Sequence, residues 1–519
     1  MQKNTFTKIG ATLIIASALV GGSVKLITAN NNANAETQQG TQLLVRPEMA
    51  VANNKAINKT TKSYINVPET ALTTNQYQDS TKYDPALAQI GAVLSQSCYS
   101  NELDDDDKPG YTNQDLHILG YDDIQLYNFD LDSEGAYNSA TNIAFTIAHK
   151  TVTIDGKKAN TFIIVLRGTP SSKEWQGDFS YQLNSGDNGA KYWEKNIYDL
   201  GNEVHRTFTE YCMSHEETIR PETENKLFVT GHSRGGGTSE CLGYLFDKDI
   251  QNNTGMMASH SEINANDDPI SKKNVAVYAI APTQAYHPTT DANTDDSEVK
   301  ANEDGEYDNI QDVVNPMDFV PTNPLTKWGY QHIGHINNLF NPKTETEANY
   351  QKFMQTYEKI AHLGKNDSSQ LYSLVAIKKE LGFGTGTQFK TLKDRVSHDQ
   401  NGMNDFSEAI HAVSPQLSDY DVPADLTFQT ADNQTETESL SPQEFFHSYA
   451  TAFIGEQPFS SPKLQSAVSG LMSNVAQTSP KALAYQSVLT HLPLTPNGPN
   501  IANHLCTTYI AWLFTNADK

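Results

Sequence analysis

Short apolar runs and amphipathic stretches alternate through the first two thirds of the chain, and this pattern predicts its main elements. The run Phe162–Leu166 is apolar at every position, which is typical of a strand buried on both faces. Strands are expected at 142–148, 151–154, 161–166, 227–229, 275–280 and 312–314. Strands that alternate with helices favour a mostly parallel sheet with helices on both faces, so the expected fold class is α/β.

Two helices between these strands have clear signals. A helix is expected to begin at Pro85, because Asp84 before it is a good N-cap and proline suits the first helical turn. A longer amphipathic helix is expected within 189–218, where apolar residues recur at spacings of three and four. These stripes indicate core packing.

Residues 336–490 break the alternation of strands and helices. Apolar residues at helical spacing predict helices near 350–360 and 371–381. A capping box at 441–444 starts a third stretch, which carries the aromatic residues of 445–453. We interpret 336–490 as a mainly helical insertion in one domain spanning 65–519, and as a candidate cap or lid over its pocket.

The N-terminal 1–35 segment has the pattern of a secretory signal peptide. Lys3 and Lys8 form a basic start, an uncharged apolar or small-residue run covers 9–24, and 33–35 offers small residues to a signal peptidase. A retained membrane anchor is the alternative, but the run is shorter than the ~20 residues that a span needs. The protein is therefore expected to be secreted and extracellular.

Composition narrows the partners of the mature chain. Residues 36–64 are polar without apolar periodicity and are interpreted as a flexible leader. The chain has 37 Lys and Arg against 62 Asp and Glu, and removing 1–35 removes three Lys, so the mature charge is 34 − 62 = −28. This balance excludes nucleic acid and anionic membrane surfaces as main partners.

The cysteines do not form a metal motif. Cys98, Cys212, Cys241 and Cys506 are too widely spaced for one. In an exported chain they allow three disulfide pairings, and buried unpaired thiols are the alternative.

The pentapeptide Gly231-His232-Ser233-Arg234-Gly235 is a G-x-S-x-G pattern between an expected strand and an expected helix. A serine on such a sharp turn sits in a strained conformation, and the flanking glycines let neighbouring backbone pass closely. The turn lifts the hydroxyl above the sheet, where the helix N-terminus directs N–H groups at the reacting atoms. Context therefore favours Ser233 as a nucleophile.

A serine nucleophile also needs a base, an acid that orients the base, and an oxyanion hole. The strand 162–166 ends in the turn Arg167-Gly168-Thr169, whose backbone N–H groups are candidates to face the top of the sheet. A simple strand-ending turn is the alternative for this segment taken alone.

Five blocks together resemble the class 3, or fungal-type, lipase family of the α/β-hydrolase superfamily. Arg167–Thr169, with Trp175 and Asp178, is similar to its first strand-turn-helix, and 229–236 is similar to its nucleophile elbow, although Arg234 stands where Leu is frequent. The remaining blocks are 278–282, 314–321 and 329–334. Their order matches, over roughly 84–335 and the C-terminal tail but not over 336–490.

The resemblance implies that Ser233 is the nucleophile and Asp318 the acid. It also implies that backbone N–H groups of Thr169 and Arg234 form the oxyanion hole. Asp312 is the rival acid, but it lies in or before the strand and so at the wrong end of the sheet.

Two histidines are candidates for the catalytic base, His504 and His491. His504 follows a turn-like stretch and precedes a good terminal helix, which is where a triad histidine belongs. His491 is the runner-up because it precedes a proline-bounded loop. His332 and His335 lie in an expected strand block and are assigned structural hydrogen bonds, and His232 is taken as the variable position of the elbow.

The leading hypothesis is a secreted serine hydrolase that cleaves carboxylic esters, with a lipid or other acyl ester as substrate and at most transient contact with a lipid interface. No cofactor is expected. No metal is expected either, because the calcium-loop spacing at 291–295 lacks the required Gly and Glu. Phospholipase or acyltransferase chemistry on the same triad is the second hypothesis. A catalytically inactive surface-binding protein is the third.

Overall fold

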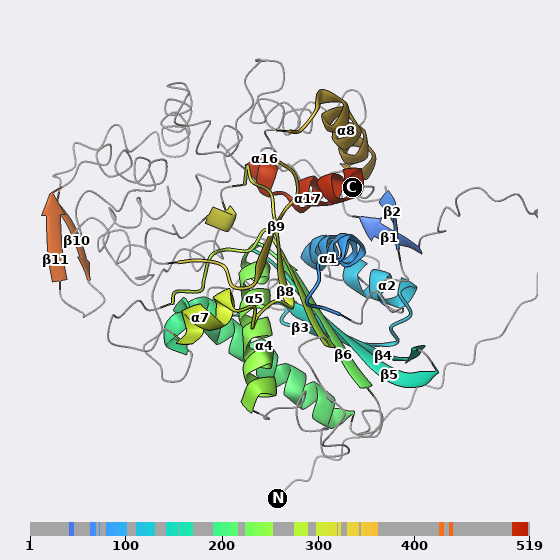
Figure 1. Ribbon diagram of the computed structural model, residues 1–519, viewed down its shortest axis with the longest axis horizontal. Coiled ribbons are helices and arrows are strands. Elements are labelled where there is room, and N and C mark those ends of the chain that lie inside the picture. The colour runs from blue at the N-terminus through green and yellow to red at the C-terminus, as the bar shows by residue number, and fades with distance from the viewer. Residues whose placement is uncertain are drawn as a thin grey trace, which may run out of the picture. The chain divides into compact units, whose positions relative to one another are not determined.

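The fold comes from a computed structural model of the chain (Figure 1). The residues that it describes are 41–45, 63–68, 72, 79–100, 110–129, 142–154, 156–169, 190–215, 224–252, 274–288, 297–318, 320–322, 330–341, 344–361, 425–429, 435–439 and 501–516.

Seven of the described strands form one sheet, in which spatial order follows chain order. They are β3 (Asp123–Tyr127), β4 (Phe145–Ile154), β5 (Lys157–Leu166), β6 (Glu224–His232), β7 (Val275–Ile280), β8 (Ile310–Val314) and β9 (His335–Asn338). β3, β4 and β5 pair antiparallel, and β5 to β9 pair parallel. The carboxyl ends of β5 to β9 therefore meet at one edge of the sheet.

Helices cover both faces of this sheet. They are α1 (Pro85–Ser97), α2 (Tyr111–Ile118), α4 (Lys195–Ser214), α5 (Arg234–Asn252), α7 (Ser297–Glu303), α8 (Glu347–Ala361), α16 (Ile501–His504) and α17 (Cys506–Thr515). Short 3-10 helices span Cys98–Ser100, Ala190–Tyr192 and Val320–Thr322. In Figure 1, α1 and α17 lie on the opposite side of the sheet from α4 and α5.

Alternation along the strands explains the two layers. Ile163 and Val165 of β5 pack into the core with α1 and α17, whereas Ile164 and Leu166 pack into the core with α4 and α5. Successive strand residues point to opposite faces, so a run that is apolar throughout feeds two cores. The predicted fold class, an α/β-hydrolase with a mostly parallel sheet and helices on both faces, is confirmed.

Several helices and strands lie close to where local sequence patterns predicted them. Asp84 caps α1, and its side chain accepts a hydrogen bond from the N–H of Ala86 at 2.8 Å. The strands expected at 142–148 and 151–154 correspond to one continuous strand, β4, which begins at Phe145. Of the block 329–334, the described residues 330–334 precede β9 and are not part of it. No strand was predicted at 123–127, where the structure has β3.

The flexible leader predicted at 36–64 needs a correction at 41–45 and 63–64. There β1 (Thr41–Val45) pairs antiparallel with β2 (Ser63–Val67). Leu43, Leu44 and Val45 are buried, and the Leu44 N–H donates to Asp115 Oδ1 at 2.7 Å. Three consecutive apolar residues within a polar segment are too short a pattern to read as periodic, but they suffice to anchor an edge hairpin on α1 and α2.

The predicted insertion 336–490 needs a correction at its start. Residues 335–338 form β9, and the expected helix at 350–360 is α8, which packs into the main core. Phe340 and Phe353 both stack on Trp512 of α17, each with ring centroids 4.3 Å apart. The first part of the block therefore belongs to the hydrolase core.

Within the rest of the block, the structure describes one antiparallel hairpin, β10 (Asp425–Gln429) and β11 (Thr435–Ser439), which was not predicted. The helices expected at 371–381 and 445–453 lie outside the described residues, as do the signal segment 1–35, Trp175, Asp178 and the 291–295 loop.

The four cysteines are buried and unbridged, which agrees with the alternative of unpaired thiols. Among the helices that are described, none combines the length and apolar character that a membrane crossing requires.

Candidate active site

Ser233 occupies a strained turn between β6 and α5. Its φ is 59°, in the left-handed region that non-glycine residues rarely adopt. The glycines around it are required by close packing. A Cβ on Gly231 would lie 2.4 Å from the Gly235 carbonyl oxygen, and one on Gly235 would lie 2.7 Å from the Leu166 carbonyl oxygen. The elbow thus has the geometry that the sequence pattern predicts.

The predicted acid lies in a rigid turn after β8. Within this turn the Asn315 side chain accepts the Met317 N–H at 3.0 Å, and Asp318 Oδ1 accepts the Val320 N–H at 3.0 Å. Asp318 is buried. The Val320 N–H therefore helps to fix the direction of the second oxygen of Asp318, Oδ2.

The predicted base lies at the end of α16, directly before α17. Asn315 Nδ2 donates to the Asn503 backbone oxygen at 3.0 Å and to its side-chain oxygen at 3.1 Å. These bonds tie the acid turn to the residue before His504. They join segments 188 residues apart in the sequence.

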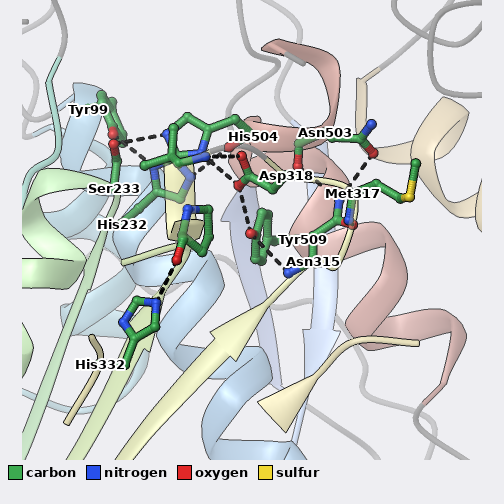
Figure 2. A network of polar contacts seen from close by, with 12 residues as sticks. Tyr99, His232, Ser233, Asn315, Met317, Asp318, His332, Asn503, His504 and Tyr509 are labelled. Atoms are coloured by element: carbon green, nitrogen blue, oxygen red, sulfur yellow. Dashed lines mark hydrogen bonds and ion pairs between the residues drawn. The ribbon is translucent and has the colours of Figure 1, made fainter. Parts of the chain in front are cut away.

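The three predicted residues form one hydrogen-bonded chain (Figure 2). His504 Nε2 lies 2.9 Å from Ser233 Oγ, and His504 Nδ1 lies 2.8 Å from Asp318 Oδ2. A carboxylate can only accept, so His504 donates from Nδ1 and its Nε2 lone pair faces the serine hydroxyl. All three side chains are buried.

A fourth side chain holds the carboxylate. The Tyr509 hydroxyl of α17 donates to Asp318 Oδ2 at 2.7 Å and accepts the Asn315 N–H at 3.0 Å. Burial first, and then the neighbouring Asp318, raise the pKa of Tyr509 well above its ordinary value, so the phenol keeps its proton. Tyr509 lies in the terminal helix that was expected after His504, and no role was predicted for it.

His232 needs a correction, because it is more than a variable position of the elbow. Its Nε2 donates to the His504 backbone oxygen at 2.8 Å, and its Nδ1 lies 2.9 Å from the Tyr99 hydroxyl (Figure 2). Burial, and then the adjacent His504, lower the pKa of His232 well below its ordinary value. A neutral ring with a proton on Nε2 must accept from Tyr99 at Nδ1. His232 therefore links α16 to the end of α1.

The segment predicted to form the oxyanion hole lies against the elbow. A Cβ on Gly168 would lie 2.5 Å from the His232 carbonyl oxygen, so the turn after β5 packs directly on the residue before Ser233. Thr169 and Arg234 are both buried there. Arg234 is the first residue of α5, whose helix dipole favours negative charge at this end.

Asp312, the rival acid, lies in the middle of β8 and belongs to a separate buried cluster. His332 Nδ1 lies 2.7 Å from Glu240 Oε1 and 3.9 Å from Asp312 Oδ2, and His332 Nε2 donates to the Pro321 oxygen at 2.7 Å. Burial raises the pKa of both Glu240 and Asp312 well above ordinary values. His332 thus makes the structural hydrogen bonds that were predicted for it.

Two other histidines that follow Asp318 in the sequence are His335 and His491. His335 lies in β9 and pairs with Asp308 at 2.8 Å. His491 lies outside the described residues. Two groups of described residues have ligand atoms close enough to hold a metal ion: Glu240 with Asp312 and His332, and Asp123 with His149 and His215. Neither group includes a residue of the hydrogen-bonded chain at Ser233.

This arrangement can perform nucleophilic chemistry at Ser233. A hydroxyl bonded to an imidazole nitrogen, which is itself oriented by a buried carboxylate, is the geometry that activates serine. The positive end of α5 begins at the residue after Ser233, where it favours the negative charge that would develop.

Comparison with known proteins agrees with the resemblance found in the sequence. Residues 163–328 match the family model described as lipase (class 3). That segment contains the turn at Thr169, the elbow and the turn that carries Asp318. No curated protein sequence matches the chain.

Several lipases are among the solved structures that are similar to the chain. One is a triacylglycerol lipase described as having a serine protease triad as its catalytic centre, with 17% identity, TM-score 0.34, and coverage of 50% of this chain and 83% of that one. Lipase II from Rhizopus niveus has 18% identity, TM-score 0.28 and coverage of 51% and 80%. The lipase from Rhizopus microsporus var. chinensis has 18% identity, TM-score 0.31 and coverage of 49% and 72%.

The family match confirms the resemblance to class 3 lipases over the segment that carries the elbow and the acid turn, and it supports carboxylic ester hydrolysis as the activity of this site.

Proposed function

We propose that this chain is a secreted serine hydrolase that cleaves lipid esters through an acyl-enzyme on Ser233, His504 and Asp318. The observation that carries the proposal is the buried hydrogen-bonded chain from Ser233 Oγ through the imidazole to Asp318 Oδ2, with steps of 2.9 and 2.8 Å. The strained φ of Ser233 supports it, since such strain is retained where function uses it.

The first half-reaction uses His504 as general base. Its Nε2 takes the Ser233 proton as Oγ attacks the ester carbonyl, and the imidazole becomes a cation between Ser233 and Asp318. Asp318 holds the tautomer and stabilises that cation, while Tyr509 and the Val320 N–H keep the carboxylate oriented. The tetrahedral intermediate carries one negative charge on the former carbonyl oxygen.

That oxyanion is assigned to the backbone N–H groups of Thr169 and Arg234. A backbone donor tolerates the arginine side chain at 234, because the side chain does not have to enter the hole. Collapse of the intermediate then expels the alcohol, which takes the proton from His504. Water deprotonated by the same histidine attacks the acyl-enzyme and releases the acid, which regenerates Ser233. Ser233, His504 and water thus account for every bond and proton in both half-reactions, without a cofactor.

A lipid substrate is the natural extension of the family match, and secretion follows from the signal pattern in 1–35. The proposal is tested with p-nitrophenyl esters of rising chain length, beside an emulsified triglyceride and a phosphatidylcholine. The expected result is hydrolysis of medium or long acyl esters and of triglyceride. Hydrolysis of phosphatidylcholine in preference to triglyceride, or acyl transfer to an added alcohol in preference to water, would replace the lipase assignment while keeping the triad.

Ser233→Ala and Ser95→Ala are the matched variants for this assay. Each removes one buried hydroxyl, and Ser95 Oγ, on α1, bonds only to Thr230 at 3.1 Å in the described part of the chain. We expect Ser233→Ala to lose about 10³-fold or more in kcat, because the nucleophile is gone. Ser95→Ala should keep wild-type kcat within about threefold. Equal losses in the two variants would contradict a nucleophilic role for Ser233.

A further inference from the structure

Two histidines and one aspartate meet at the antiparallel edge of the sheet, away from Ser233. Asp123 begins β3 and lies directly opposite His149 in the β3–β4 register. His215 is the C-terminal cap of α4, which ends over this pair. The three elements therefore bring together side chains 26 or more residues apart in sequence, and nothing in the chemistry at Ser233 uses them.

The polar atoms of these side chains converge on one carboxylate oxygen. Asp123 Oδ2 lies 2.5 Å from His215 Nε2 and 3.5 Å from His149 Nδ1. All three candidate donor atoms lie within 4.8 Å of one another. Ligands of a tetrahedral zinc ion, at bond lengths near 2.1 Å, are separated by about 3.3 Å. The Asp123–His149 spacing already fits, and the shorter spacing opens by less than 1 Å through half-exposed side chains.

The hydrogen bonds of His215 leave the correct nitrogen facing the carboxylate. His215 Nδ1 lies 2.7 Å from the Tyr211 backbone oxygen, which can only accept, so Nδ1 donates. In the neutral ring, Nε2 then carries a lone pair that points at an anionic oxygen 2.5 Å away. Either a proton or a cation must lie between them. Metal-binding histidines commonly donate their other ring N–H to a carbonyl in this way.

His149 can release its present partner without leaving that partner unsatisfied. The Tyr211 hydroxyl lies 2.7 Å from His149 Nδ1 and 3.3 Å from the Asp123 backbone oxygen. It has one proton and two acceptors, so it can bond to the backbone oxygen when a metal takes Nδ1.

We infer that Asp123, His149 and His215 form a divalent-cation site of the zinc class, which joins β3, β4 and α4. Two imidazoles and one carboxylate suit zinc better than calcium or magnesium, which prefer oxygen ligands. Partial exposure of Asp123 and His215 leaves room for water as a fourth ligand. The site lies two to three strand spacings, about 10–14 Å, from β6, and none of its side chains belongs to the hydrogen-bonded chain at Ser233, so its role is structural.

The test measures zinc bound to tag-free full-length protein after EDTA treatment and dialysis against micromolar Zn²⁺. We expect about one zinc per wild-type chain by elemental analysis, and a rise of about 3 °C or more in Tm at a hundredfold excess over Kd. The stoichiometry should fall to near zero in His215→Gln. Asp123→Asn, which keeps the shape of the side chain, is the second variant in case His215→Gln does not fold.

His205→Gln is the matched control. His205 Nε2 lies 2.8 Å from Asp249 Oδ2 with similar exposure, but among the described residues this pair has no third ligand. Zinc binding that survives in His205→Gln and disappears in His215→Gln supports the site. The inference is overturned if wild type retains no stoichiometric zinc, if both variants lose it equally, or if only Glu240→Gln loses it. Ester hydrolysis should survive in His215→Gln, so failure here is distinguishable from failure of the proposed function.

Discussion

Asp115 makes the stability of this protein fall as pH rises from about 4 to about 7. Its carboxyl is fully buried between α1, α2 and β1, where Oδ1 accepts the Leu44 N–H at 2.7 Å and Oδ2 lies 2.5 Å from Ser97 Oγ. Burial outweighs both hydrogen bonds and raises the pKa of Asp115 to about 7 from an ordinary value of 3.8. The hairpin of β1 and β2 is therefore hydrogen-bonded to a carboxyl whose pKa lies near neutrality.

The sign and size of the effect follow from linkage. Between these two pKa values the native state holds the proton and the unfolded state does not, so the free energy of unfolding falls as pH rises. A shift of 7 − 3.8, about 3 units at 1.36 kcal/mol each, gives about 4 kcal/mol lost by pH 8. Asn at this position reproduces the protonated acid, since its oxygen accepts from Leu44 and its nitrogen donates to Ser97.

The assay compares Asp115→Asn with wild type by urea or thermal unfolding from pH 4.5 to 8.5. We expect near-equal stability at the acid end and a variant that is more stable by about 4 kcal/mol at the alkaline end. Asp122→Asn makes the same chemical change on an exposed side chain and is the control for the substitution itself. A pH-independent difference for Asp115→Asn would show that burial does not raise the pKa of Asp115 in the native state.

Three further predictions concern the site and the surface. Tyr509→Phe removes one donor to Asp318 and should lower kcat about tenfold with KM unchanged, while a wild-type kcat would show that the Tyr509 bond does not position the acid. His504→Ala should be as damaging as Ser233→Ala, because triad members act as a unit, whereas His491→Ala should stay near wild type; the reverse result would move the base to His491. The net charge is −25 for the full chain and would be −28 after removal of the proposed signal segment. Binding to anionic vesicles at low salt should therefore be no stronger than binding to zwitterionic ones, and a marked anionic preference would reveal a local basic patch.

The main sheet strands and the elbow were predictable because their signals are local. A run such as Phe162–Leu166 specifies a buried strand within five residues, and a G-x-S-x-G turn specifies its own backbone. Asp318 and His504 were predicted from their positions relative to expected elements and from the family resemblance. The hydrogen bonds between them join residues 186 apart, which no local pattern encodes.

What the sequence missed depends on tertiary contacts. His232 and Tyr509 had roles that become visible only when α16 and α17 pack beside the elbow. The helix α8 was assigned to the insertion because an apolar stripe predicts that a helix is packed, but not which element it packs against. In the structure, Phe353 of α8 stacks on Trp512 of α17. The short strands β1 and β3 carry too few residues for a periodic signal.

Covalent labelling at Ser233 tests the central claim most directly. The full-length protein is treated with a fluorophosphonate at neutral pH, and the labelled peptide is identified by mass spectrometry. We expect one phosphonyl group per chain on Ser233, with labelling lost in Ser233→Ala and slowed about 10³-fold in His504→Ala, since the base must activate the hydroxyl. Labelling of another serine, or equal labelling in His504→Ala, would contradict it.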